Sequence, residues 1–297
     1  MPRQREGSGG TTLPRRQLGK ALREARDALG YTLQQVSEAL DIGKSTLSRL
    51  ELGQNVRVKP REIEYICSFY ELPPEKVEHL KSLAEQASTK SWWQGDRDLM
   101  APGFDTYVDL EASANHLRFF QSLIVPGLLQ TADYARSLGE SFYVPETPEE
   151  IDRRVALRMR RASIITRQTK PVHAEFVLHE SLLRTLVGSR QIMADQMRHL
   201  ADLSTRENIV IRILQHSAGF PVGAPLTPFI VLDFPQSRGS AEPPIVYTES
   251  PVGTMFFEEE GDVKRFREMY DILSEKAMDD VKSRDFLRKM AKAHSGK

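Results

Sequence analysis

Five hydrogen-bonding side chains lie within the six-residue segment "KSTLSR", and none of them is acidic: Lys44, Ser45, Thr46, Ser48 and Arg49. Lysine and arginine can donate to O6 and N7 of guanine, and the hydroxyl groups can bond base edges or phosphates. Leu47 and Leu50 lie three residues apart, which indicates one apolar side of a short helix. We therefore expect a helix that buries its leucines and directs the five polar side chains at the bases of double-stranded DNA.

Further helices are needed to hold this segment in place. An apolar stripe with steps of three and four residues predicts a preceding amphipathic helix, made by Leu18, Leu22, Ala25 and Leu29. Gly30 can end it, Thr32 can cap a second helix, and residues 41–43 form a tight connection to "KSTLSR". A fourth helix is expected over 59–70, and Pro74 begins a fifth. Two short helices joined by such a turn form a helix-turn-helix unit, which lays its second helix in the major groove.

A second group of polar residues around this unit could bond DNA phosphates without reading sequence. These residues are Arg15, Arg16, Lys20, Gln34, Arg57 and Lys59. The chain has no net charge, yet residues 1–61 hold 12 Lys and Arg against 6 Asp and Glu. This asymmetry predicts an anionic partner for the N-terminal part of the chain.

Within residues 15–72, the run "LREARDALGYTLQQVSEALDIGKSTLSRLELGQ" resembles the Xre/Cro-type helix-turn-helix family. The resemblance implies an all-α, five-helix, lambda-repressor-like domain over 14–87, and we expect a disordered tail over 1–13. Two positions depart from the family pattern. Leu33 occupies the place of a glutamine that often contacts phosphate, and Asp41 replaces the usual glycine of the turn. Asp41 must therefore form the turn as an Asx-type residue.

The rest of the chain alternates helix and strand patterns. Residues 88–105 are small, polar and rich in glycine and proline, which predicts a linker, and 106–293 are expected to form an α+β domain. Its first element is expected to be a helix over 106–120. Strands are predicted in "VHAEFVLHE", "NIVIRILQ", "TPFIVLDF", "PPIVYTE" and "GTMFFEE", and two helices follow at the C-terminus.

Several segments of this larger domain resemble the domain of unknown function that follows Xre-type modules in many actinobacterial regulators, including the WhiJ-like and Scr-type groups. They include "SLIVPGLLQTADYARSL", "RHLADLSTRENIVIRILQHSAGF" and "IVYTES". The resemblance implies transcriptional control in which this domain receives a signal through a small BldB-like partner protein. Some such pairs are antitoxin-like.

Six arginines follow one another closely in the segment 153–167 with no acidic residue between them. Arg154, Arg158 and Arg161 could form a surface that docks an acidic partner, and the segment could also be a second nucleic-acid surface. The alternative is a core helix with a solvated basic face, because Val155 and Met159 make an apolar ridge.

No catalytic constellation is apparent, so we expect no enzyme activity and no cofactor. The seven histidines include no pair at helical metal-site spacing. His173 and His179 could share one face of a strand, but no carboxylate or cysteine completes a ligand set in the sequence pattern, so no metal is expected. The single cysteine, Cys67, can form no internal disulfide and fits a buried helix position.

No apolar run approaches the ~20 residues of a membrane helix, and the N-terminus lacks a secretory signal. We therefore expect a cytoplasmic protein, associated with the nucleoid when bound to DNA. The predicted function is that of a dimeric transcriptional regulator, a repressor. Two alternatives remain open: an antitoxin-like protein-interaction module with secondary DNA binding, and a regulator that senses a small molecule in the apolar interior of the larger domain.

Overall fold

The structure, a computed structural model, describes residues 13–54, 58–87, 92–101, 103–142, 144–237, 240–241, 243–250 and 253–296. The chain divides into two compact units. The described residues up to Gly95 form the first unit together with Gly103–Ser113 and a short hairpin, β5 (Gln236–Ser237) and β6 (Ser240–Ala241). The remaining described residues form the second unit. The expected tail lies outside the described residues except for Leu13, and so do 88–91 and 102 of the expected linker.

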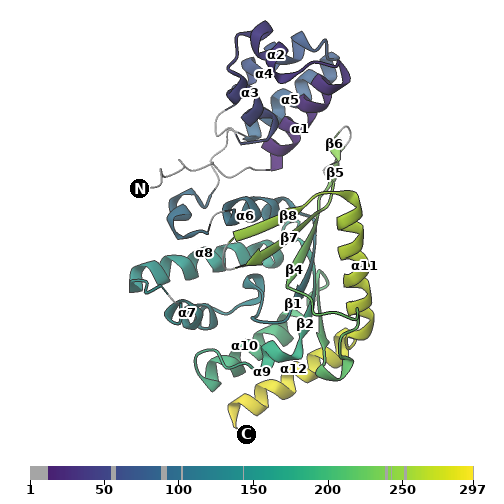
Figure 1. Ribbon diagram of the computed structural model, residues 1–297. Coiled ribbons are helices and arrows are strands. Elements are labelled where there is room, and N and C mark those ends of the chain that lie inside the picture. Colours follow the sequence, from purple (N-terminus) through teal and green to yellow (C-terminus); the bar gives the residue numbers. More distant parts are fainter. Residues whose placement is uncertain are drawn as a thin grey trace. The chain divides into compact units, whose positions relative to one another are not determined.

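Five helices build the main part of the first unit (Figure 1): α1 (Leu13–Ala28), α2 (Leu33–Leu40), α3 (Lys44–Glu51), α4 (Pro60–Phe69) and α5 (Pro74–Ala87). Local signals set their ends. The side chain of Thr32 accepts from the N–H of Gln35, while that of Gln35 accepts from the N–H of Thr32, so α2 begins with a capping box. Gly30, at φ +72°, follows the end of α1, and proline is the first residue of α4 and of α5.

The helices enclose one apolar core. Its fully buried members come from all five helices and include Leu18, Leu22, Val36, Leu47, Ile63 and Leu80. Cys67 is buried among them, as the spacing predicted. α6 (Phe104–Ser113) also belongs to this unit, whereas η1 (Gln94–Leu99) is divided between the two units after Gly95.

A six-stranded mixed sheet in the order β3-β2-β1-β4-β7-β8 forms the centre of the second unit. Its strands are β1 (His116–Gln121), β2 (His173–His179), β3 (Ile209–Leu214), β4 (Phe229–Asp233), β7 (Ile245–Ser250) and β8 (Gly253–Phe257). β1, β2 and β3 run parallel, and the other pairs are antiparallel. Parallel neighbours require long crossover connections, and the chain makes these with helices.

These helices cover the faces of the sheet. The crossover from β1 to β2 contains η2 (Gly127–Leu129), α7 (Ala132–Glu140) and α8 (Pro148–Thr166), and that from β2 to β3 contains α9 (Glu180–Arg184) and α10 (Arg190–Leu203). A short turn, η3 (His216–Ala218), follows β3, and α11 (Glu260–Lys276) and α12 (Asp280–Ser295) end the chain. Figure 1 shows α11 on the side of the sheet opposite α7 and α8. Val263, Tyr270 and Leu273 of α11 pack on Val177 and Val231 of the sheet.

The structure confirms the fold class, an all-α helix-turn-helix unit followed by an α+β domain, and corrects one element. The predicted helix over 106–120 is wrong beyond Ser113, because His116–Gln121 form β1. This strand is buried on both faces: Leu117 and Phe119 point one way and Phe120 the other, all at most 5% exposed. A short segment that is apolar on both sides lacks the alternation that distinguishes a half-buried strand from a helix.

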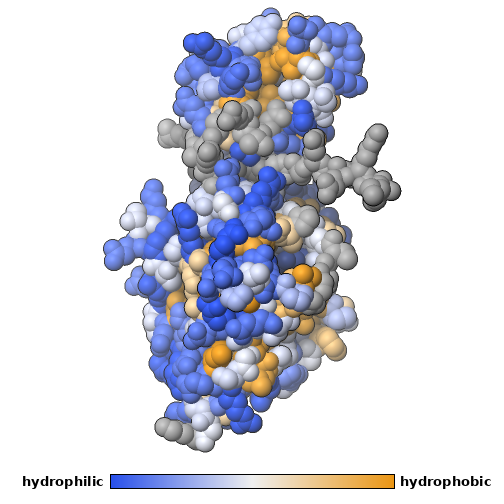
Figure 2. Space-filling view, turned by 90° about the vertical axis from the view of Figure 1, so that its left-hand side faces the viewer, coloured by the Kyte–Doolittle hydropathy of each residue, from blue (hydrophilic) through white to orange (hydrophobic). Residues whose placement is uncertain are grey.

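Among the described residues, no helix is both long and apolar enough to span a membrane. On the face drawn in Figure 2, hydrophilic side chains predominate and apolar ones appear as separate patches. Among the described residues of the first unit, four large apolar side chains are exposed: Leu29, Tyr31, Leu52 and Tyr65.

Candidate nucleic-acid interface

The two sides of α3 differ as the sequence predicted. Leu47 and Leu50 are 0% and 7% exposed and face the core. Lys44, Ser45, Thr46 and Arg49 are exposed, and Ser48 is half-buried. The only hydrogen bond recorded for these side chains among the described residues runs from Nε of Arg49 to the carbonyl oxygen of Ser45, at 3.3 Å. The polar side of α3 therefore presents a row of donors in which most groups are directed to solvent.

A buried ion pair fixes the far end of α3 to α1. Nε and Nη2 of Arg26 donate to Oε1 and Oε2 of Glu51 at 2.7 and 2.9 Å, a bidentate contact between residues that are 8% and 7% exposed. The hydrogen bond to Glu51 raises the pKa of Arg26 above its usual value. Nη1 of Arg26 also donates to the carbonyl oxygen of Tyr31 at 2.8 Å. One guanidinium group thus joins the end of α1, the loop before α2 and the end of α3.

The backbones of α1 and α3 approach closely at Gly19. A Cβ atom at this position would lie 2.6 Å from the carbonyl oxygens of both Leu50 and Glu51. Glycine is therefore required where α1 crosses α3, and any larger residue must push the two helices apart. No local sequence pattern marks Gly19, Arg26 or Glu51, since each acts through a partner at least 25 residues away.

The turn between α2 and α3 depends on Asp41. This residue adopts the left-handed conformation, with φ 53° and ψ 39°, and its N–H donates to the carbonyl oxygen of Ser37. Oγ of Ser37 donates to the carbonyl oxygen of Ile42 at 2.6 Å. Aspartate is one of the few residues other than glycine that tolerate this conformation, which explains how the chain manages without the usual glycine.

The residues expected at phosphates divide into three groups. Lys20, Gln34 and Lys59 are exposed and Arg16 is half-buried. Arg57 lies outside the described residues. Arg15 is 5% exposed, and its Nε donates to the carbonyl oxygen of Ala87 at 2.9 Å. This side chain joins α1 to the end of α5, so its burial corrects the expectation that it contacts phosphate.

The arginines expected to dock an acidic partner do not form an open surface. Nη1 of Arg158 donates to Oε1 of Gln130 at 2.7 Å, and burial next to Arg161 and Arg154 lowers the pKa of Arg158 to about 10. Arg161 is only 7% exposed. Arg154 pairs with Glu146 and donates to the carbonyl oxygen of Leu99. These contacts hold α8 inside its own domain and count against an open docking surface. Arg160 and Arg167 are exposed while Ile151 and Val155 are buried, which agrees with a core helix that has a solvated basic face.

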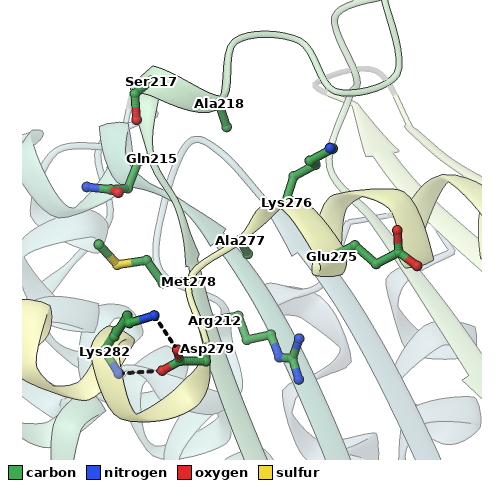
Figure 3. A pocket seen from close by; sticks show the side chains of 10 residues that line it. All are labelled: Arg212, Gln215, Ser217, Ala218, Glu275, Lys276, Ala277, Met278, Asp279 and Lys282. Atoms are coloured by element: carbon green, nitrogen blue, oxygen red, sulfur yellow. Dashed lines mark hydrogen bonds and ion pairs between the residues drawn. The ribbon is translucent and has the colours of Figure 1, made fainter.

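A shallow pocket of about 560 Å³ lies in the second unit where β3 meets the connection between α11 and α12 (Figure 3). Three of its charged side chains already have partners: Nζ of Lys282 lies 2.9 Å from Oδ2 of Asp279, and Nη1 of Arg212 donates to the carbonyl oxygen of Ser274 at 3.3 Å. The lining is mainly polar, so this pocket does not match the apolar ligand site of the small-molecule alternative.

Two models of known protein families match the chain, one in its N-terminal part and one in its C-terminal part. The model of a helix-turn-helix domain matches residues 17–80, and the model of a domain of unknown function, DUF5753, matches residues 104–289, more than half of the chain. The chain belongs to the DUF5753 family. Comparison with curated proteins gave no match, and comparison with solved structures gave none either.

These matches agree with the two resemblances noted in the sequence. The helix-turn-helix match covers α2 and α3 and supports a DNA-binding regulator rather than an enzyme. The DUF5753 domain includes the six-stranded sheet and its helices, and it carries no assigned activity.

Proposed function

We propose that this DUF5753 protein is a sequence-specific transcriptional repressor whose helix α3 reads base edges in the major groove. Lys44, Ser45, Thr46, Ser48 and Arg49 are the proposed reading residues. The observation that carries the proposal is the two-sided nature of α3: its leucines and Glu51 are buried, while a row of donors without an acidic group faces outward. Recognition helices of this class contact bases with residues near their N-terminal end.

Phosphate contacts are proposed for Arg16, Lys20, Gln34 and Lys59, and for Arg57 on the basis of the sequence alone. Their role is to fix the position of α3 on the duplex. Gln34 already bonds Oε1 of Glu38 at 2.6 Å, so it would have to exchange this partner for a phosphate oxygen.

Two further features belong to the proposal. A single small reading helix makes too few contacts with DNA for tight binding. Two-fold dimers double these contacts by reading half-sites about one helical turn apart, so we propose a homodimer. The DUF5753 domain is proposed to dimerise and to receive its signal through a small BldB-like partner protein, as the resemblance to WhiJ-like regulators implies.

Fluorescence anisotropy at physiological salt tests base reading. Short duplexes that tile the region upstream of the gene are titrated with the wild type, Arg49→Ala, Lys59→Ala and the control Lys76→Ala, which removes an exposed charge from α5. One tile should bind most tightly. Arg49→Ala should cost ~1–3 kcal/mol on this tile and little on random DNA, whereas Lys59→Ala should weaken binding to all duplexes alike. Equal losses on specific and random DNA for Arg49→Ala would reject its assigned role.

The remaining parts have separate tests. Light scattering of the full-length protein should give the mass of two chains, and a monomer at micromolar concentration would contradict the proposed dimer.

Purification from the native host should yield a stoichiometric small partner, and removal of this partner should change the affinity of the protein for the bound tile. An unchanged affinity would favour the protein-interaction alternative.

A further inference from the structure

Three potential metal ligands from two separate strands lie together in the DUF5753 domain. His116 belongs to β1, and His173 and Glu175 belong to β2. One ligand atom from each of the three lies within 4.8 Å of the other two. The sequence pattern suggested no carboxylate to accompany His173, and the structure corrects that point by bringing both Glu175 and His116 to it.

The register of the sheet explains this grouping. β1 and β2 are parallel, and His116 pairs with His173 while Arg118 pairs with Glu175. Side chains two residues apart on a strand point to the same face, so His173 and Glu175 both lie on the face of His116. The two imidazole rings meet edge to face, with centroids 4.8 Å apart.

The ligand atoms already lie close together, and a bound ion would replace the hydrogen bond between two of them. Nε2 of His116 lies 2.8 Å from Oε1 of Glu175. Nδ1 of His173 is buried, and it has no hydrogen-bond partner among the described groups. A buried polar atom without a partner is costly and therefore calls for an explanation, and a bound ion is one of the standard ones. Ligands of one zinc ion lie roughly 3–3.5 Å apart, so the three ligand atoms, which lie within 4.8 Å of one another, would have to move closer together to bind it.

The surroundings also support a metal site. Nδ1 of His116 lies 3.9 Å from Oδ2 of Asp233, which is too far for a hydrogen bond, so this carboxylate would orient the histidine only after a small shift. Asp233 is held by Arg118, whose Nη1 lies 2.7 Å from Oδ2, and by Arg267. This arrangement leaves Nε2 of His116 as the atom directed toward Glu175.

We propose that His116, His173 and Glu175 bind a divalent first-row transition-metal ion, with Asp233 as the residue that orients His116. Two histidines and one carboxylate are a donor set that Zn²⁺ and Fe²⁺ share, and three protein ligands leave coordination positions for water or an anionic ligand. The site is independent of the proposed DNA contacts, because all four residues belong to the DUF5753 domain.

The test uses full-length protein without a histidine tag, freed of metal with a chelator. Addition of Co²⁺ should produce the visible absorption of a bound ion at one equivalent per chain, and Zn²⁺ should displace it. His173→Gln and Glu175→Gln should each weaken Zn²⁺ binding at least ~10-fold, since even residues beyond the ligands contribute this much. His199→Gln on α10 is the matched control and should bind like the wild type.

Two results would overturn the proposal. One is the absence of saturable Co²⁺ or Zn²⁺ binding by the wild type. The other is loss of binding in His216→Gln with retention in His173→Gln, which would assign the ion to the separate pair of His179 and His216, whose ring centroids are 4.9 Å apart. If a ligand variant fails to fold, X-ray absorption of the Zn²⁺-loaded wild type decides: it should show imidazole and oxygen ligands without sulfur, and a spectrum without imidazole scattering would refute the site.

Discussion

Replacing Glu51 with glutamine should destabilise the helix-turn-helix unit strongly, although the two side chains have almost the same shape. The substitution leaves the Arg26 side chain, which is only 10% exposed, opposite a neutral amide that can accept at one position only. The ion pair that remains is with Asp27, whose side chain is 55% exposed. Breaking a buried ion pair by changing one partner costs about 3–5 kcal/mol. The free energy of unfolding of a whole domain is only about 5–15 kcal/mol, so the helices of the variant should unfold locally far more often than those of the wild type.

The size of the effect depends on the charge left behind, and a double variant separates this from simple loss of contacts. In Arg26→Met/Glu51→Leu neither charge remains. The carbonyl oxygen of Tyr31 loses the donor that lies 2.8 Å away in the wild type, which costs about 1 kcal/mol. The double variant should therefore be more stable than Glu51→Gln alone.

Hydrogen exchange followed by mass spectrometry on the full-length protein measures these differences as opening free energies of α1 and α3. Glu64→Gln is the matched control, because Glu64 meets Lys81 at 3.6 Å with half of its own side chain exposed, and exposed pairs contribute little. If Glu51→Gln exchanged like Glu64→Gln, or if the double variant were no more stable than Glu51→Gln, the role assigned to the buried pair would be wrong.

Three other expectations follow from buried contacts. Gly19→Ala should lower the free energy of unfolding of the five-helix unit by ~1–3 kcal/mol in denaturant, because the Cβ of alanine would displace α3. The same displacement should weaken DNA binding, and an unchanged affinity would contradict the link between this helix crossing and DNA binding. Burial raises the pKa of Cys67 to about 11, so the Raman S–H band of this single cysteine should persist above pH 9; its loss near pH 9 would mean an exposed thiol. Gln196→Ala should cost ~1–3 kcal/mol in thermal unfolding, since it removes the partners of the Thr131 N–H and the Leu129 carbonyl; a melting temperature equal to that of the wild type would show that water replaces them.

The helix-turn-helix unit was predictable because its signals are local. Thr32, Gly30 and Pro60 act on neighbouring residues, and the apolar steps of three and four mark each buried side. The same logic placed the exposed donors of α3, since burial of Leu47 and Leu50 fixes which side faces out.

Features that join distant segments could not be predicted in this way. Arg15 bonds Ala87, which lies 72 residues away at the end of α5. The residues around Arg15 in the sequence therefore do not indicate that this side chain is buried. Arg158 and Arg161 look like a basic face in sequence, but the segment at Gly127 covers them: a Cβ there would lie 3.7 Å from Nη1 of Arg161. The sequence pattern predicts a helix at His116, and a helix there gives no reason to place this residue beside His173 on a neighbouring strand.

The central claim is that Arg49 of α3 reads a base pair, and a double-mutant cycle between protein and DNA tests it most directly. Affinities of the wild type and Arg49→Ala are measured for the bound tile and for versions with each base pair replaced in turn. The account predicts one position in each half-site where the two losses are not additive, with a coupling of ~1–3 kcal/mol. Additive losses at every position would contradict it, because the base contact assigned to Arg49 would then not exist.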